Sequence, residues 1–166
     1  MSDRPPLLPE HLRDPGDAWV EGPDGKRYWG RFGAAGLLVL HPPLGVLLQL
    51  RAGWSHHGGT WGIPGGALKA GEDATAAALR ESHEEAGIPD GAVRVIEYSV
   101  VDLGFWSYTT VLGIADSHFD PVIADYESVA LEWVAVDEVE FRELHPGFAR
   151  AWPELRERLN RELPSQ

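Results

Sequence analysis

Residues 65–88 read GGALKAGEDATAAALRESHEEAGI, and they join a glycine-rich turn to an alanine-rich segment that ends in a cluster of acids. Residues 73–86 are rich in alanine and are followed by Gly87, which is typical of a helix that ends at a glycine. The end of this segment carries three carboxylates: Glu81, Glu84 and Glu85. At this spacing like charges repel, and the negative end of the helix macrodipole costs each of them about 0.3–1 kcal/mol. An acidic protein can carry such a face in contact with solvent, but the same cluster is also suited to bind a cation.

The spacing of the residues around this cluster is more informative than its charge. Gly66 is followed after five residues by Glu72, and after seven more by RESHEEAGI, which begins at Arg80. This arrangement resembles the Nudix box, G-x5-E-x7-R-E-U-x-E-E-x-G-U, in which U is a bulky aliphatic residue. All seven fixed residues are present, and an accidental match in the chain has odds of about one in a million. The one departure is Ser82 at the first aliphatic position, where we expect the hydroxyl to bond to the helix backbone one turn earlier.

The resemblance implies a fold, a reaction and a metal. It implies an α+β protein, a Nudix-type α/β/α sandwich with a mixed β-sheet and two main helices, over about 130 residues. It further implies hydrolysis of a nucleoside diphosphate linked to another group, with Mg²⁺, for which Mn²⁺ can substitute. The metal ligands that it implies are three carboxylates and a backbone carbonyl of the preceding glycine pair: Glu81, Glu84, Glu85 and Gly66 or its neighbour Gly65.

The resemblance also gives roles to residues outside the acidic cluster. Glu72 and Arg80 are expected to form a salt bridge that ties the loop to the helix. Some members of the superfamily use a glutamate on a later loop as general base, and Glu127 occupies a comparable place before a strand. The alternative to this catalytic role is that Glu127 is an ordinary acidic residue of a loop.

The remaining sequence predicts strands on both sides of this helix. Residues 1–17 are expected to form a flexible arm and residues 18–166 a single Nudix hydrolase domain. Apolar runs and turn residues predict a short hairpin in WVEGPDGKRYWG, a second hairpin in LLVLHPPLGVLLQL, strands in VRVIEYSVVD and FWSYTTVLGIA, and a strand in LEWVAVDEV. A final helix is predicted over residues 148–163, with Pro153 in its first turn.

Composition limits the partners. The chain of 166 residues has no cysteine, which excludes disulfides, thiolate metal sites and a cysteine nucleophile. Its net charge of −12 disfavours nucleic acid polymers and anionic membranes as partners. Without a membrane-length apolar run or a signal-peptide pattern, we expect a cytoplasmic protein whose partner is a small nucleotide. A homodimer stays open.

The substrate is less well determined than the reaction. Arg51 ends an apolar strand before the glycine-rich loop and is a candidate to bind phosphate, although a surface ion pair is equally compatible. Trp61 and Tyr108 are candidates to stack on a nucleobase, with packing in the core as the alternative. Secondary signatures of other Nudix subclasses are missing, which by elimination favours a MutT-type enzyme that converts a (deoxy)nucleoside triphosphate, such as an oxidised purine nucleotide, to monophosphate and pyrophosphate. Hydrolysis of ADP-ribose or another nucleotide sugar, and a non-catalytic nucleotide sensor, remain alternatives.

Overall fold

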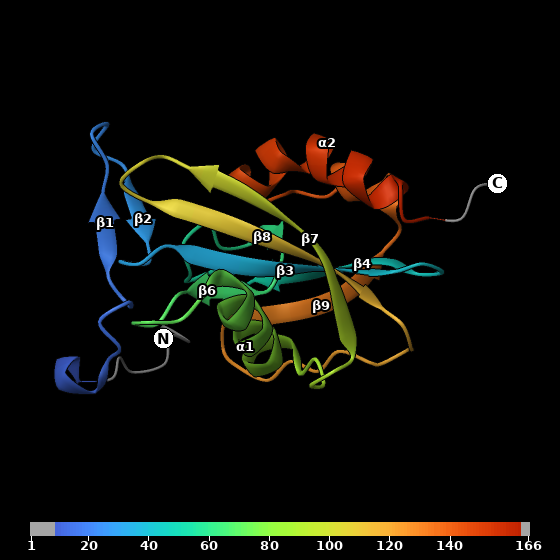
Figure 1. The fold of residues 1–166 in the computed structure, drawn as a ribbon, viewed down its shortest axis with the longest axis horizontal. Helices are drawn as coiled ribbons and strands as arrows, with labels where there is room; N and C mark the ends of the chain where they lie inside the picture. The colour runs from blue at the N-terminus through green and yellow to red at the C-terminus, as the bar shows by residue number, and fades with distance from the viewer. Residues whose placement is uncertain (1–8, 164–166) are drawn as a thin grey trace.

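The computed structural model describes residues 9–163, so the first eight residues of the expected arm and residues 164–166 lie outside it. A mixed β-sheet lies between two α-helices, with α1 (Ala74–Ala86) on one face and α2 (Pro146–Asn160) on the other (Figure 1). The α+β sandwich predicted from the sequence is therefore confirmed.

The central sheet has seven strands in the order β5-β4-β3-β8-β7, with β6 paired to β3 and β9 paired to β4. The strands are β3 (Ala34–His41), β4 (Gly45–Arg51), β5 (Trp61–Gly62), β6 (Gly65–Ala67), β7 (Val93–Asp102), β8 (Ser107–Ala115) and β9 (Ser128–Val134). β3 and β8 are parallel, and the other pairs are antiparallel. The hairpin predicted in the proline-containing segment is the β3–β4 pair.

β3 separates two apolar cores because its side chains alternate between the faces of the sheet. Leu38 and Leu40 belong to the cluster that α2 covers, and Leu37 and Val39 belong to the cluster that α1 covers. All eight residues of β3 are buried, as expected for a central strand with a helix on each side. The sheet thus holds α1, with its acidic residues, in a fixed place.

Two predicted boundaries are wrong. The segment LEWVAVDEV is not one strand, because β9 ends at Val134 and a 3₁₀ helix, η2 (Val136–Phe141), follows. The final helix starts earlier than predicted: Pro146 occupies its first turn, and Pro153 lies inside it. Pro153 is exposed, so the carbonyl that it leaves without a helical partner lies on the solvent side of α2.

The N-terminal part of the described chain forms a separate two-stranded sheet. β1 (Trp19–Glu21) and β2 (Arg27–Trp29) are antiparallel, as the turn residues between them predict, and a 3₁₀ helix, η1 (Glu10–Leu12), precedes them. Figure 1 shows this hairpin beside the end of the sheet at which β3 and β8 begin. Within residues 9–163, no helix is both long and apolar enough to cross a membrane.

Candidate active site

The sequence of α1 fixes both of its ends. Asp73 caps the first turn by accepting a hydrogen bond from the N–H of Ala76 at 2.7 Å, and Gly87 ends the helix in the left-handed conformation at φ 63°. Ser82 is fully buried and donates its hydroxyl to the carbonyl of Ala78 at 2.6 Å, as expected. Because this hydroxyl needs no partner outside the helix, α1 lies close against the sheet.

Glu85 is a carboxylate buried between α1 and the sheet, with 2% of its surface exposed. Its Oε2 accepts hydrogen bonds from the N–H of Gly65 at 3.1 Å and from Nε2 of Gln49 at 3.2 Å. Gln49 also donates to the hydroxyl of Ser128 at 2.6 Å, which fixes the amide. Burial first, and then the charge of Glu81, raises the pKa of Glu85 well above its ordinary value. The nearby carboxylates of Glu127 and Asp125 raise it further.

Two acids from the loop before β9 join Glu85. One carboxylate oxygen from each of Glu85, Asp125 and Glu127 lies within 4.8 Å of the others. The loop is held there by hydrogen bonds from the N–H of Ala124 to the carbonyl of Glu85 at 3.2 Å and from the N–H of Ala52 to the carbonyl of Glu127 at 2.8 Å. Glu127 was singled out from the sequence, whereas Asp125 was missed, although its place in the same short acidic segment was a signal.

Glu81 lies against the glycine pair of β6. A β-carbon added to Gly66 would be 2.6 Å from Cδ of Glu81, so the backbone and the carboxylate can approach only because this residue is glycine. Gly66 pairs with Ala35 at the start of β3, which fixes its position. Burial raises the pKa of Glu81 to about 7, although Arg80 acts in the opposite direction.

Arg80 links the loop before α1 to the acidic face of the helix. Its Nε and Nη2 donate to the two carboxylate oxygens of Glu72 at 2.8 and 2.9 Å, so the predicted salt bridge is present and bidentate. Nη2 also donates to the carbonyl of Ala67, and Nη1 donates to Glu81 at 2.9 Å and to Glu84 at 3.2 Å. Glu84 is half-exposed and is not one of the three carboxylates that converge at Glu85. Its role as a metal ligand stays a prediction.

A basic group adjoins the loop that carries Glu127, because Arg51 precedes Ala52, whose N–H binds the carbonyl of Glu127. Arg51 donates from Nε to the carbonyl of His56 at 3.0 Å and forms no ion pair within the described part of the chain. The rings of His56 and His57 are 4.1 Å apart, and those of His57 and His145 are 4.7 Å apart. Burial, and then the charge of Arg51, lowers the pKa of His145 to about 4. Its neutral Nδ1 can therefore accept the hydrogen bond from the N–H of Gly147 that caps α2, at 3.0 Å.

The two aromatic candidates for base stacking have partners within the protein. The guanidinium of Arg142 lies over the ring of Trp61 at 4.8 Å and forms an ion pair with Glu132 at 2.6 Å. The hydroxyl of Tyr108 lies against Gly36, where even a β-carbon would not fit. Burial, followed by the charge of Glu85, raises the pKa of Tyr108, which places this side chain in the electrostatic field of the acidic cluster. The roles of Trp61 and Tyr108 in substrate binding stay predictions.

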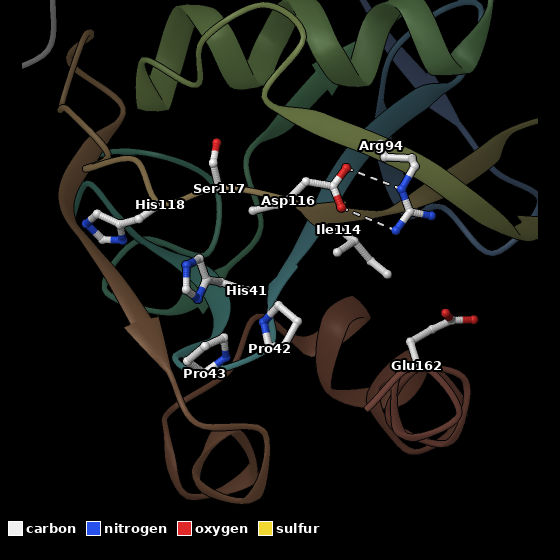
Figure 2. Close-up of a pocket in the computed structure, with 10 residues that line it drawn as sticks. His41, Pro42, Pro43, Arg94, Ile114, Asp116, Ser117, His118 and Glu162 are labelled. Atoms are coloured by element: carbon white, nitrogen blue, oxygen red, sulfur yellow. Dashed lines mark hydrogen bonds and ion pairs between the residues drawn. The ribbon is translucent and has the colours of Figure 1, made fainter. Parts of the chain in front are cut away.

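A cavity of about 430 Å³ lies at the other end of the sheet and does not include the acidic cluster. His41, the last residue of β3, lines it, roughly 20 Å along the strand from Ala35 beside the glycine pair. Figure 2 shows Arg94 and Asp116 at its wall, joined by two contacts of 3.3 Å. His118, also in the wall, contacts a carboxylate outside it at 2.9 Å. Of its two carboxylates, Asp116 is paired with Arg94 and Glu162 comes from the end of the chain beyond α2, so they do not form the cluster of three that is found at Glu85.

Known proteins are similar to this chain in sequence and in fold. A family model described as NUDIX domain matches residues 30–155. A Mycobacterium tuberculosis protein (strain ATCC 25618 / H37Rv) with the provisional name 8-oxo-dGTP diphosphatase 3 is 48% identical over an alignment of 166 positions, which covers 94% of this chain and 76% of that protein. A nucleoside triphosphate pyrophosphatase/Nudix hydrolase fusion protein of Bifidobacterium longum is 40% identical over 94% of this chain and 34% of its own length. The crystal structure of RenU, a Nudix hydrolase from M. smegmatis, has a TM-score of 0.79 at 43% identity and covers 91% of this chain and 99% of that chain.

Proposed function

The chain belongs to the Nudix hydrolase family, and from that membership we propose that it hydrolyses a (deoxy)nucleoside triphosphate to monophosphate and pyrophosphate with Mg²⁺. The observation that carries this proposal is the convergence of Glu85, Asp125 and Glu127 at the end of the acidic helix. The relative that is 48% identical, provisionally named as an 8-oxo-dGTP diphosphatase, favours an oxidised purine nucleotide as substrate.

The donor set of the cluster fits a hard divalent cation. Carboxylate oxygens from Glu85, Asp125 and Glu127 approach one another. Burial raises the pKa values of Glu85 and Asp125, which means that their ionised forms are poorly stabilised by the protein itself. Mg²⁺ and Mn²⁺ prefer such oxygen ligands. We assign these three residues, with Glu81 and the carbonyl of Gly66 beside them, to metal binding. A bound cation would offset charge on the diphosphate and lower the pKa of the attacking water.

Hydrogen bonds hold the reactive carboxylates in place. The N–H of Gly65 and the amide of Gln49 fix Oε2 of Glu85, and Arg80 fixes Glu81 from the other side. Such fixed side chains need little reorganisation when substrate binds, which is the main way in which a protein promotes phosphoryl transfer. Arg80 and Glu72 therefore act as positioning residues.

Glu127 is suited to remove the proton of the attacking water. Among the three convergent carboxylates, Glu85 is buried and Asp125 is partly buried, whereas Glu127 is exposed. An exposed carboxylate beside the cluster is accessible to the water that attacks phosphorus and can pass its proton to solvent. We assign Glu127 as the general base on this ground: one of its carboxylate oxygens joins the cluster, and the other is assigned to take the proton.

Arg51 is suited to bind a phosphate of the substrate. It is fixed through Nε, it forms no ion pair with described residues, and it precedes Ala52, whose N–H binds the carbonyl of Glu127. A guanidinium without a carboxylate partner, so close to the acidic loop, provides a positive site for an anion that the cluster would otherwise repel.

A turnover screen tests the proposal. The purified protein is incubated with Mg²⁺ or Mn²⁺ and a panel of canonical and oxidised nucleoside triphosphates, ADP-ribose and a dinucleoside polyphosphate, and nucleotide, pyrophosphate and phosphate products are separated. We expect monophosphate and pyrophosphate in equal amounts from a triphosphate, with the highest kcat/KM for an oxidised purine. The screen also includes Glu85→Gln, which we expect to lose turnover, and Glu157→Gln, in an exposed glutamate of α2, as its control. Preferred cleavage of ADP-ribose would contradict the substrate class, and tight binding without any product would indicate a sensor.

A further inference from the structure

Two tryptophans of the N-terminal hairpin form an exposed aromatic pair that none of the roles above explains. Trp19 on β1 and Trp29 on β2 are directly opposite each other, with ring centroids 5.0 Å apart in an edge-to-face arrangement. Each keeps 39% of its surface exposed. The pair lies before residues 30–155, the part of the chain that the family model matches.

The opposite face of the hairpin attaches it firmly to the domain. The ring of Tyr28 packs against Phe105 at 5.5 Å and against Trp106 at 4.8 Å. The indole N–H of Trp106 donates to the carbonyl of Trp29 at 3.1 Å. Tyr28 and the carbonyl of Trp29 therefore attach the hairpin to the domain, and the tryptophan rings lie on the other face, where the ring of Trp19 contacts that of His56.

A continuous series of contacts connects the tryptophan pair to the acidic cluster. The ring of Trp19 is 5.4 Å from that of His56, and the carbonyl of His56 accepts from Arg51 at 3.0 Å. The next residue, Ala52, binds the backbone of Glu127 at 2.8 Å. An aromatic surface, a guanidinium and a carboxylate cluster therefore follow one another, which is the order of base, phosphate and metal in a nucleotide complex.

We propose that Trp19 and Trp29, with His56 beside them, bind the nucleobase of the substrate by stacking, while Arg51 directs the phosphates to the carboxylate cluster. The guanidinium of Arg27 covers one side of Trp19 at 4.8 Å, so the base lies on the indole surface that remains open. A purine is favoured over a pyrimidine because its two rings cover more of an indole. This proposal rests on the proposed function, since it assumes a nucleotide substrate.

Substitution of the tryptophans tests the proposal. Trp29→Leu and Trp19→Leu keep an apolar side chain in the hairpin but remove the aromatic face. We expect KM for the purine nucleotide to rise about 5- to 100-fold while kcat changes less than about threefold. Inhibition by inorganic tripolyphosphate, which has no base, is expected to stay unchanged. Phe141→Leu, in an aromatic residue of η2 that is 81% exposed, is the matched control.

The outcomes separate this inference from the proposed function. A variant that loses thermal stability but keeps the wild-type KM would show that the pair only stabilises the hairpin, and the inference would be wrong. Equal losses of affinity for nucleotide and tripolyphosphate would also overturn it, because the pair would then act on the phosphates. If the wild type cleaves no nucleotide, the proposed function fails, and binding of a purine nucleoside triphosphate, measured calorimetrically in wild type and Trp29→Leu, still decides the inference.

Discussion

The two ends of β3 carry charged residues in different ways. At the first end, Glu81 and Glu85 lie among further carboxylates, and their pKa values are raised first by burial and then by neighbouring negative charge, although Arg80 opposes the shift at Glu81. At the far end, Arg94 contacts Asp116, and His118 contacts a carboxylate of its own. The difference supports the proposed site at the first end: buried carboxylates with raised pKa values can bind a cation in place of a proton, whereas the ion pair at the far end is already balanced.

The largest expected effect is on the chemical step, from the variant Glu85→Gln. Glutamine keeps the volume of Glu85 and an oxygen that can accept from Gly65, but it removes the charge that would hold a metal. We expect kcat to fall about 10²- to 10³-fold, while the metal-free thermal stability does not decrease, since a buried charge is lost. Steady-state kinetics at saturating Mg²⁺ measure the first effect. Full turnover of this variant would contradict the metal-binding role of Glu85.

A smaller effect is expected from Asp125→Asn. Asp125 contributes one of the three convergent oxygens, but it is less buried than Glu85. We expect the Mg²⁺ concentration for half-maximal activity to rise about 10- to 100-fold, with partial recovery of kcat at high Mg²⁺. A titration of activity with Mg²⁺ measures this, and Asp120→Asn, at the far end of the sheet, is the control. An unchanged Mg²⁺ requirement in Asp125→Asn would restrict the site to the acids of α1 and Glu127.

The contrast between these two acids also shows what the sequence could predict. Glu85 belongs to a local pattern, because helix spacing and Gly87 fix it relative to Glu81 whatever the rest of the chain does. Asp125 lies forty residues away, and the loop between β8 and β9 brings it to the cluster. Such a contact depends on tertiary packing, which no single local pattern encodes. The sequence therefore predicted the helix half of the cluster and only part of the loop half.

The wrong boundaries have the same origin. Val136 and Val139 were interpreted as part of a strand, but both are buried as a one-turn repeat in η2. Either Pro146 or Pro153 suits a helix start, and the choice falls on Pro146 because the side chain of His145 caps the N–H of the following glycine. The tryptophan pair was missed because the sequence does not show which face of the short hairpin the domain covers.

The two ends of the sheet also differ in how their arginines are paired. The side chain of Arg80 is 22% exposed and binds Glu72 bidentately, whereas that of Arg94 is 58% exposed. Lysine cannot form the bidentate contact, so Arg80→Lys is expected to lower the free energy of unfolding by about 1–2 kcal/mol. Arg94→Lys should change it by less than about 0.5 kcal/mol, as is usual for an exposed pair. Urea denaturation of both variants measures the difference. An equal loss of unfolding free energy in the two variants would show that the bidentate contact with Glu72 stabilises the fold no more than the exposed pair does.

An effect confined to low pH is expected from the basic group beside the site, where His145 must stay neutral to cap α2. Its pKa is about 4 in the folded protein and near 6.5 when unfolded, so the unfolded chain takes up the proton first and stability is lost as the pH falls from 6.5 towards 4. For a partly exposed ring this loss is about 1–2 kcal/mol. His145→Asn keeps a side-chain acceptor for the N–H of Gly147 but does not titrate. We therefore expect the variant to match the wild type in chemical denaturation at pH 7.5 and to be the more stable protein at pH 4.5. Parallel pH profiles for the two proteins would mean that the proton on His145 does not affect folding.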